Sequence, residues 1–311
     1  MLRTWNYAWW KPIVGILVVA VSMVIVAPLL LMPVLAIGVA IEGGPFLESF
    51  QEAATLTTVD PAALLYLNLV LGSMILVTWF VIRVLHRMRP RWLSSVMPGM
   101  RWHFLFACLG LAVVALFVQV LVGTLLPGTT ESEFEGTLNE FTGTTVALGL
   151  VVMLTTPLQA AGEEYLFRGY LLQALGSLFT KWVAVVATAA LFAAAHGVQN
   201  FPLFFDRFMF GLIAGWLVVK TGGLEAGIAM HILNNFLAFG FALAFGDLTE
   251  SLNISEVSWW NIVLTLTQSA VYAVLVLLLA SRMHLASRTR PPAPAVSGRV
   301  PSDPSRTATT G

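Results

Sequence analysis

Residues 162–169 read Gly-Glu-Glu-Tyr-Leu-Phe-Arg-Gly, and they place two adjacent carboxylates within a strongly apolar part of the chain. A charged side chain at the centre of a bilayer costs about 2.5–3.5 kcal/mol on insertion scales, and more in simulations. Glu163 and Glu164 therefore need a role that offsets this cost: chemistry, ion transfer or the bracing of a polar core.

Helical spacing divides the two glutamates. Residues four apart share a helix face, so Glu164 and Arg168 are predicted to form a carboxylate–guanidinium pair. Glu163 points about 100° away from Glu164 and is available as the reactive carboxylate. The alternative is that all three side chains form one buried ion network that only fixes helix packing.

The composition identifies an integral membrane protein. Of the 311 residues, 58% are hydrophobic and only 10% are charged, and the mean hydropathy is +0.85. A soluble domain carries about 25% charged residues, so this chain has too few to cover a soluble surface. The formal charge is zero and no long basic block is present, which argues against a nucleic-acid partner. A single cysteine, Cys108, excludes an intrachain disulfide framework and a cysteine-based zinc site.

About eight apolar stretches can cross the membrane, since a spanning helix needs about 20 apolar residues. The candidates are residues 13–41, 62–85, 104–126, 144–162, 182–200, 203–219, 224–246 and 260–281. We therefore predict an all-α, polytopic membrane helical bundle. A three-span scaffold is expected over residues 1–143, a core over 144–246, a last span within 247–286 and a disordered, Pro- and Ser-rich tail over 287–311.

Lys and Arg occur in alternate connections between the predicted spans. They precede the first span and lie between spans two and three, at Lys181 and Lys220, and after the last span. The connections after spans one and three contain Glu and Asp but no cation. The positive-inside rule then places both termini in the cytoplasm, which requires an even number of crossings. The chain is therefore expected to be a multi-pass membrane protein, and the sequence sets no oligomeric state.

The costly polar residues of the later spans are two histidines and two asparagines. His196 ends one span, while His231, Asn234 and Asn235 lie together on another. Each alone has a plain interpretation as an interhelical hydrogen-bonding group. Together with Glu163, however, they can converge on one water molecule.

Such a set supports two hydrolytic schemes. Without metal, Glu163 and His196 orient and deprotonate a water, and His231 and Asn235 donate hydrogen bonds to the oxyanion. With metal, Glu163, His196 and His231 are an adequate ligand set for Zn²⁺, with water in the open position. The spacing does not choose between the schemes.

Three ordered motifs resemble those of the CAAX protease and bacteriocin-processing (CPBP) family of intramembrane proteases. They are Glu163-Glu164-x-x-x-Arg168, Phe192-x-x-x-His196 and His231-x-x-x-Asn235, within about residues 145–246. The resemblance implies an eight-helix membrane protease whose polar cavity opens towards the cytosol. It implies Glu163 and His196 as the water activators, His231 and Asn235 at the oxyanion, and Glu164, Arg168 and Phe192 in support. Eukaryotic members remove the tripeptide after a prenylated cysteine, whereas bacterial members are linked to bacteriocin maturation, self-immunity and other processing.

The expected function is thus hydrolysis of a peptide bond in a peptide or membrane-protein substrate. One alternative is a non-catalytic immunity or binding protein, because intact motifs indicate capacity rather than use. Another is a proton-coupled transporter, which should show inverted repeats and polar residues in both halves; neither is visible in the sequence.

Straight helices would keep Glu163 and His196 apart. Glu163 follows the inward-running fourth span, while fourteen residues from Trp182 raise His196 by about 20 Å. We therefore predict either a kink at Pro157, with a tilted or re-entrant segment over residues 158–179, or a fifth span displaced towards the cytosol. A separation above about 10 Å would exclude a shared water, because a general base reaches its proton directly or through one water.

Overall fold

The computed structural model describes residues 2–4, 6–126 and 138–289. Within these ranges the chain is helical and contains no strand, only one isolated antiparallel bridge between Ser95 and Gly223. The prediction of an all-α bundle is confirmed. Most of the tail that was predicted to be disordered, from residue 290 onward, lies outside the described residues.

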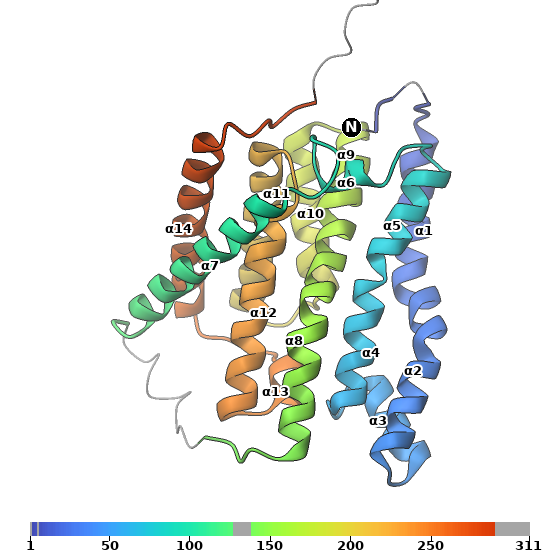
Figure 1. Cartoon of the computed structure of the whole chain (residues 1–311), viewed down its shortest axis with the longest axis vertical. Coiled ribbons are helices and arrows are strands. Elements are labelled where there is room, and N and C mark those ends of the chain that lie inside the picture. The colour runs from blue at the N-terminus through green and yellow to red at the C-terminus, as the bar shows by residue number, and fades with distance from the viewer. Residues whose placement is uncertain (1, 5, 127–137, 290–311) are drawn as a thin grey trace, which may run out of the picture.

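The first half of the chain forms one side of the bundle and an oblique helix (Figure 1). Its helices are α1 (Trp10–Val21), the π-helical turn η1 (Ser22–Val26), α2 (Ala27–Glu42), α3 (Phe46–Thr55), α4 (Pro61–Gly72), α5 (Met74–Val84), α6 (Arg91–Ser94) and α7 (Trp102–Gly123). Together, α1, η1 and α2 make one long span, as do α4 and α5.

The second half supplies the centre and the far side of the bundle. Its helices are α8 (Gly143–Glu164), the π-helical segment η2 (Tyr165–Leu171), α9 (Leu172–Leu178), α10 (Lys181–Ala195), α11 (Phe201–Thr221), α12 (Glu225–Phe245), α13 (Leu248–Leu252) and α14 (Trp260–Arg282). Figure 1 shows the N-terminus and the end of α14 at the same end of the bundle, as an even number of crossings requires.

Seven helical segments among the described residues are long and apolar enough to cross a membrane, and α10 is a shorter apolar helix. Together they give the expected bundle of about eight spans. Two predicted boundaries were wrong, however. The fourth span does not end near residue 162 but continues through η2 and α9 to Leu178, and the fifth ends at Ala195 rather than at residue 200.

Small residues allow α8 to pack closely against α4. A Cβ atom on Gly162 would lie 2.1 Å from the backbone oxygen of Leu71, and one on Gly72 would lie 2.7 Å from the side chain of Leu158. Close approach at small residues is a general means of helix association in membranes. This contact fixes the part of α8 that immediately precedes Glu163.

A buried ion pair joins the start of α7, in the N-terminal scaffold, to the start of α12, in the core. Arg101, at the start of α7, donates from Nε and Nη2 to the two carboxylate oxygens of Glu225 at 2.9 and 2.6 Å, and its backbone N–H also donates to Glu225. Glu225 is the first residue of α12 and is fully buried. The pair therefore sets the start of the helix that carries His231.

Candidate active site

The level of Glu163 in the bundle follows from the length of its helix. Residues Gly143–Leu178 form one helical segment of 36 residues, about 54 Å long, which exceeds the bilayer core of about 30 Å. Glu163 lies 15 residues before the end of α9, and His196 lies 15 residues after the start of α10. Because α9 and α10 are joined by a two-residue turn and pack together, the two residues reach the same level.

The predicted re-entrant segment after Pro157 was wrong. Pro157 lies within α8, and the helix continues beyond it. The distortion occurs instead at η2, directly after the glutamates, where the backbone is π-helical from Tyr165 to Leu171. Such π-helical insertions are frequent at functional sites. The second alternative, a fifth span displaced towards the cytosol, stays a prediction; the structure shows that α10 is short and stops beside Glu163.

Glu163 faces both histidines. Its Oε2 lies 3.7 Å from Nε2 of His196 and 3.9 Å from Nε2 of His231, so the three side chains meet well within the 10 Å limit. These distances are too long for direct hydrogen bonds but suit a bridging water. Glu163 is only 3% exposed, and its Oε2 has no hydrogen-bond partner among the described protein atoms. Oε2 of Glu163 therefore faces both imidazoles without a direct hydrogen bond to either.

The tautomer of His196 is set by its own helix. Its Nδ1 lies 2.8 Å from the backbone oxygen of Phe192. A carbonyl oxygen only accepts, so Nδ1 carries the hydrogen and the Nε2 lone pair of the neutral ring faces Glu163. His196 can therefore accept a hydrogen bond from a water at this position. Its side chain is 33% exposed, which makes it the accessible edge of the site.

Glu164 has a different set of partners. Its Oε1 accepts from Nη1 of Arg168 at 2.7 Å and lies 3.1 Å from Nδ1 of His231, and the pair with Arg168 is fully buried. The predicted Glu164–Arg168 pair is therefore present. A Cβ atom on Gly227 would lie 2.6 Å from Glu164 Oε2, so a glycine on α12 makes room for this carboxylate.

Phe192 lies between the ion pair and the histidine. The guanidinium carbon of Arg168 is 4.3 Å from the centre of its ring, and the imidazole of His196 is 4.4 Å from it. Phe192 is 3% exposed. A buried aromatic face stabilises a cation that has given up its hydration. The ring thus contacts both Arg168 and His196.

Asn235 does not point directly at Glu163. Its Nδ2 donates to Oε1 of Gln159 at 2.8 Å, and Nε2 of Gln159 donates to Oε1 of Glu163. Sequence reasoning missed Gln159, because an uncharged glutamine in an apolar run did not stand out. Its place one helical turn before Glu163 was the available signal.

Two further contacts of polar groups in the later spans were not predicted. Arg207 donates from Nη1 to the backbone oxygen of His196 and to Oε1 of Gln199, both at 2.8 Å, and so holds the chain just after α10. On the far side, Gln268 of α14 donates to Oδ1 of Asn234 at 2.8 Å. Both contacts are tertiary, so spacing along the sequence could not reveal them.

The metal scheme can be compared with the distances between the three side chains. Among the described residues, no group of three or more His, Cys, Asp or Glu side chains is arranged to hold a metal ion. Glu163 Oε2 is, however, 3.7 and 3.9 Å from the two imidazole nitrogens, and two donors bound to one tetrahedral Zn²⁺ at about 2.0–2.2 Å lie about 3.3–3.6 Å apart. Only a small movement of the side chains would therefore be needed to bring these donors to the separation of zinc ligands.

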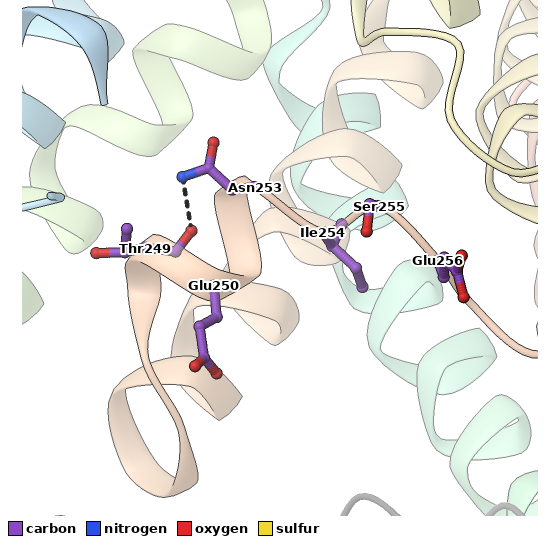
Figure 2. Close-up of a pocket in the computed structure, with 6 residues that line it drawn as sticks. All are labelled: Thr249, Glu250, Asn253, Ile254, Ser255 and Glu256. Atoms are coloured by element: carbon purple, nitrogen blue, oxygen red, sulfur yellow. Dashed lines mark hydrogen bonds between the residues drawn. The ribbon is translucent and has the colours of Figure 1, made fainter. Parts of the chain in front are cut away.

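A hollow on the surface lies away from these residues. It is lined by α13 and by the segment that follows this helix, at the end of the bundle opposite the N-terminus (Figures 1 and 2). Its lining consists of Thr249, Glu250, Asn253, Ile254, Ser255 and Glu256. None of the six is a predicted site residue, so the hollow is separate from the candidate active site.

Residues 143–237 match the model of a family described as type II CAAX prenyl endopeptidase Rce1-like. The predicted family resemblance is confirmed. The Rce1-like segment includes the two glutamates, both site histidines, Asn235 and Gln159. At the level of the family, the match supports an intramembrane endopeptidase of the CAAX type.

Two bacterial proteins are similar in sequence. An uncharacterized 24.3 kDa protein of Escherichia coli is 34% identical over 86 residues, which span 27% of this chain and 38% of that protein. The uncharacterized protein YyaK of Bacillus subtilis is 22% identical over 228 residues, which span 69% of this chain and 75% of that protein. No solved structure matches the chain significantly.

Proposed function

We propose that this chain is an intramembrane endopeptidase in which Glu163 and His196 activate the hydrolytic water. The carrying observation is the position of Glu163 Oε2, which is buried and faces Nε2 of both histidines at 3.7 and 3.9 Å. A buried carboxylate oxygen needs a polar partner. A water between these groups supplies that partner and is held where a substrate carbonyl can approach from the exposed edge at His196.

In the proposed reaction, Glu163 and His196 both accept a hydrogen bond from the water, and Glu163 also transfers its proton. The water donates one hydrogen bond to Glu163 Oε2 and one to Nε2 of His196, which leaves a lone pair of its oxygen directed at the scissile carbonyl carbon. Glu163 accepts the proton as the C–O bond forms. The same proton passes to the leaving amine as the C–N bond breaks, so Glu163 returns to the carboxylate.

His231 is the proposed oxyanion donor. Its Nδ1 contacts the carboxylate of Glu164 at 3.1 Å and therefore donates to it. The oxyanion role requires a second hydrogen on Nε2, because a ring with its hydrogen on Nδ1 alone has only a lone pair at Nε2. With that hydrogen, Nε2 can donate to an oxyanion that forms beside Glu163. The oxyanion role predicted for Asn235 stays a prediction, since its amide contacts Gln159.

The substrate is proposed to be a peptide or membrane protein that reaches the site from the bilayer or the cytosol. We place the protein in a bacterial inner membrane with both termini in the cytoplasm, because Lys and Arg occur in alternate connections. The alternatives of a non-catalytic immunity protein and a proton-coupled transporter predict no new peptide termini.

Comparative peptidomics tests the function. Membranes expressing wild type and Glu163→Gln are compared for new peptide termini, with Gln268→Met as a control that changes a buried amide of α14. We expect cleavage products in wild type and control that are absent from Glu163→Gln. Identical peptide sets in all three would exclude the protease and favour the immunity protein.

Activity that survives complete metal removal would exclude the zinc scheme, and activity restored by Zn²⁺ alone would support it.

A further inference from the structure

Gln159 connects Oε1 of Glu163 to Asn235 on α12. It lies one helical turn before Glu163 on α8 and is 6% exposed. Both functional atoms of its amide are used: Nε2 donates to Glu163 Oε1, and Oε1 accepts from Asn235 Nδ2 at 2.8 Å. A buried amide that is satisfied at both ends has one favoured orientation.

This contact separates the two oxygens of Glu163. Oε1 is held by Gln159, and Oε2 is left facing His196 and His231. A glutamate side chain has three rotatable bonds, and a general base must lie within hydrogen-bond reach of the proton that it removes. Fixing Oε1 therefore fixes the position of Oε2 relative to the water.

The carboxylate of Glu163 only accepts hydrogen bonds, so the Nε2 end of the Gln159 amide faces it. The Nδ2–H group of Asn235 donates to Oε1 at the other end of the same amide. A flipped Gln159 amide would place its NH₂ group against the NH₂ group of Asn235 and its oxygen against the carboxylate of Glu163. Both contacts are repulsive, so the orientation with Nε2 towards Glu163 is strongly favoured.

We propose that Gln159 is a positioning residue for the general base and that Asn235 acts on the reaction through Gln159. The chain Asn235–Gln159–Glu163 thus runs from α12 to α8 and sets the aim of the carboxylate. This inference rests on the proposed endopeptidase activity, and it assigns Asn235 a role other than donation to the oxyanion.

The first test is the kinetics of Gln159→Met on a peptide identified by the comparison of membranes above. Methionine keeps the length of the side chain but neither donates nor accepts strongly, so we expect kcat to fall about 10- to 100-fold. KM should stay within about twofold, because Gln159 touches Glu163 rather than the substrate. Gln268→Met is the matched control, since it removes a buried glutamine that contacts Asn234 instead; its kcat should stay within about threefold of wild type.

The second test separates the two roles of Asn235. If Asn235 acts through Gln159, Asn235→Leu lowers kcat about as much as Gln159→Met, and the double variant is no slower than either single variant. If Asn235 is instead an oxyanion donor, Asn235→Leu lowers kcat by a further factor of about 10² to 10³ in the Gln159→Met background. That additive result would overturn the proposal for Asn235, and a wild-type kcat in Gln159→Met would overturn it for Gln159.

Gln159→Glu covers the case in which Gln159→Met does not fold. This near-isosteric change replaces the donor with a second carboxylate beside Glu163, so we expect a loss of kcat at least as large. Unchanged kcat in Gln159→Glu would contradict the positioning role. The proposed function fails separately: if Glu163→Gln cleaves as fast as wild type, the endopeptidase scheme is wrong whatever Gln159 does.

Discussion

At the scale of single residues, the buried carboxylates of Glu163 and Glu164 have different partners. Glu164 accepts from Arg168 and contacts His231, so its charge is compensated by hydrogen-bonded partners. Glu163 has an amide donor on one oxygen and two imidazoles opposite the other. Buried charges are tolerated when they are paired in this way. Removing one partner destabilises the fold, because the remaining charge is buried without compensation.

Arg168→Met should destabilise the protein strongly. It removes the cation that contacts Glu164 and leaves a fully buried carboxylate, for which broken buried pairs cost about 3–5 kcal/mol. We expect a clear fall in the midpoint of thermal unfolding in detergent. Adding Glu164→Gln should recover part of the loss, because the orphaned charge is removed as well. Arg89→Met, at an exposed position, is the control and should leave the midpoint unchanged; an equal fall in both single variants would contradict this role of Arg168.

His86 should make stability depend on pH. His86 follows α5, and its Nε2 lies 3.0 Å from the hydroxyl of Tyr170. Burial, and to a smaller extent the charge of Lys11, lowers the pKa of His86 from 6.5 to about 4. The unfolded chain then takes up a proton before the folded protein does. The stability held above pH 6.5 is therefore lost as the pH falls from about 6.5 to about 4. Unfolding midpoints measured from pH 7 to pH 4.5 should fall in wild type and fall less in His86→Asn; parallel curves would refute the assignment.

Much of the site was visible in the sequence, and one class of residue was not. Helical spacing predicted the Glu164–Arg168 pair, and the motifs brought Glu163, His196 and His231 together. Gln159 was missed although it lies one helical turn before Glu163, whereas its bond to Asn235 and the bond of Arg207 to the backbone of His196 join different helices. Spacing along one helix predicts local pairs but carries no information on such tertiary contacts.

At the scale of elements, the decisive feature is that α8, η2 and α9 form one helical segment. The apolar run ends at the glutamates, and the sequence therefore suggested that the span ended there. A helix ends where its backbone hydrogen bonds end, however, and here the helix continues through the glutamates into η2 and α9. Hydrophobicity alone could not place Glu163 in the middle of a 36-residue segment.

Gly162→Ala should disturb the contact between α8 and α4. A methyl group there would lie 2.1 Å from the backbone oxygen of Leu71, a distance that requires the helices to separate. We expect a lower unfolding midpoint and reduced activity, because the next residue is Glu163. The matched control is Gly149→Ala on the same helix, where a Cβ atom meets nothing within 4 Å. Equal effects of the two substitutions would mean that the α4–α8 contact does not constrain the site.

At the scale of the whole molecule, the described termini lie at one end of the bundle and α13 at the other (Figure 1). The alternation of cations along the sequence predicted this even number of crossings without any knowledge of packing. The oblique course of α7 and its Arg101–Glu225 tie to α12 could not be predicted, since both depend on which helices become neighbours.

Cysteine labelling in intact cells tests the proposed orientation. Cys108 is fully buried, so the background from the native thiol should be low. Glu250→Cys on α13 should react with a membrane-impermeant maleimide added outside the inner membrane. Arg89→Cys, between α5 and α6, should react only after the membrane is opened. The reverse pattern would invert the topology and place both termini outside the cytoplasm.

The most direct test of the central claim is the kcat of Glu163→Gln. The purified protein is reconstituted in proteoliposomes and assayed on a peptide that wild-type membranes cleave, with Gln268→Met as the folded control. Glutamine preserves the shape of the side chain but cannot accept the water proton, so we expect kcat to fall by about 10²- to 10⁴-fold while KM changes little. A Glu163→Gln protein that cleaves within threefold of the wild-type rate would contradict the assignment of Glu163 as the general base.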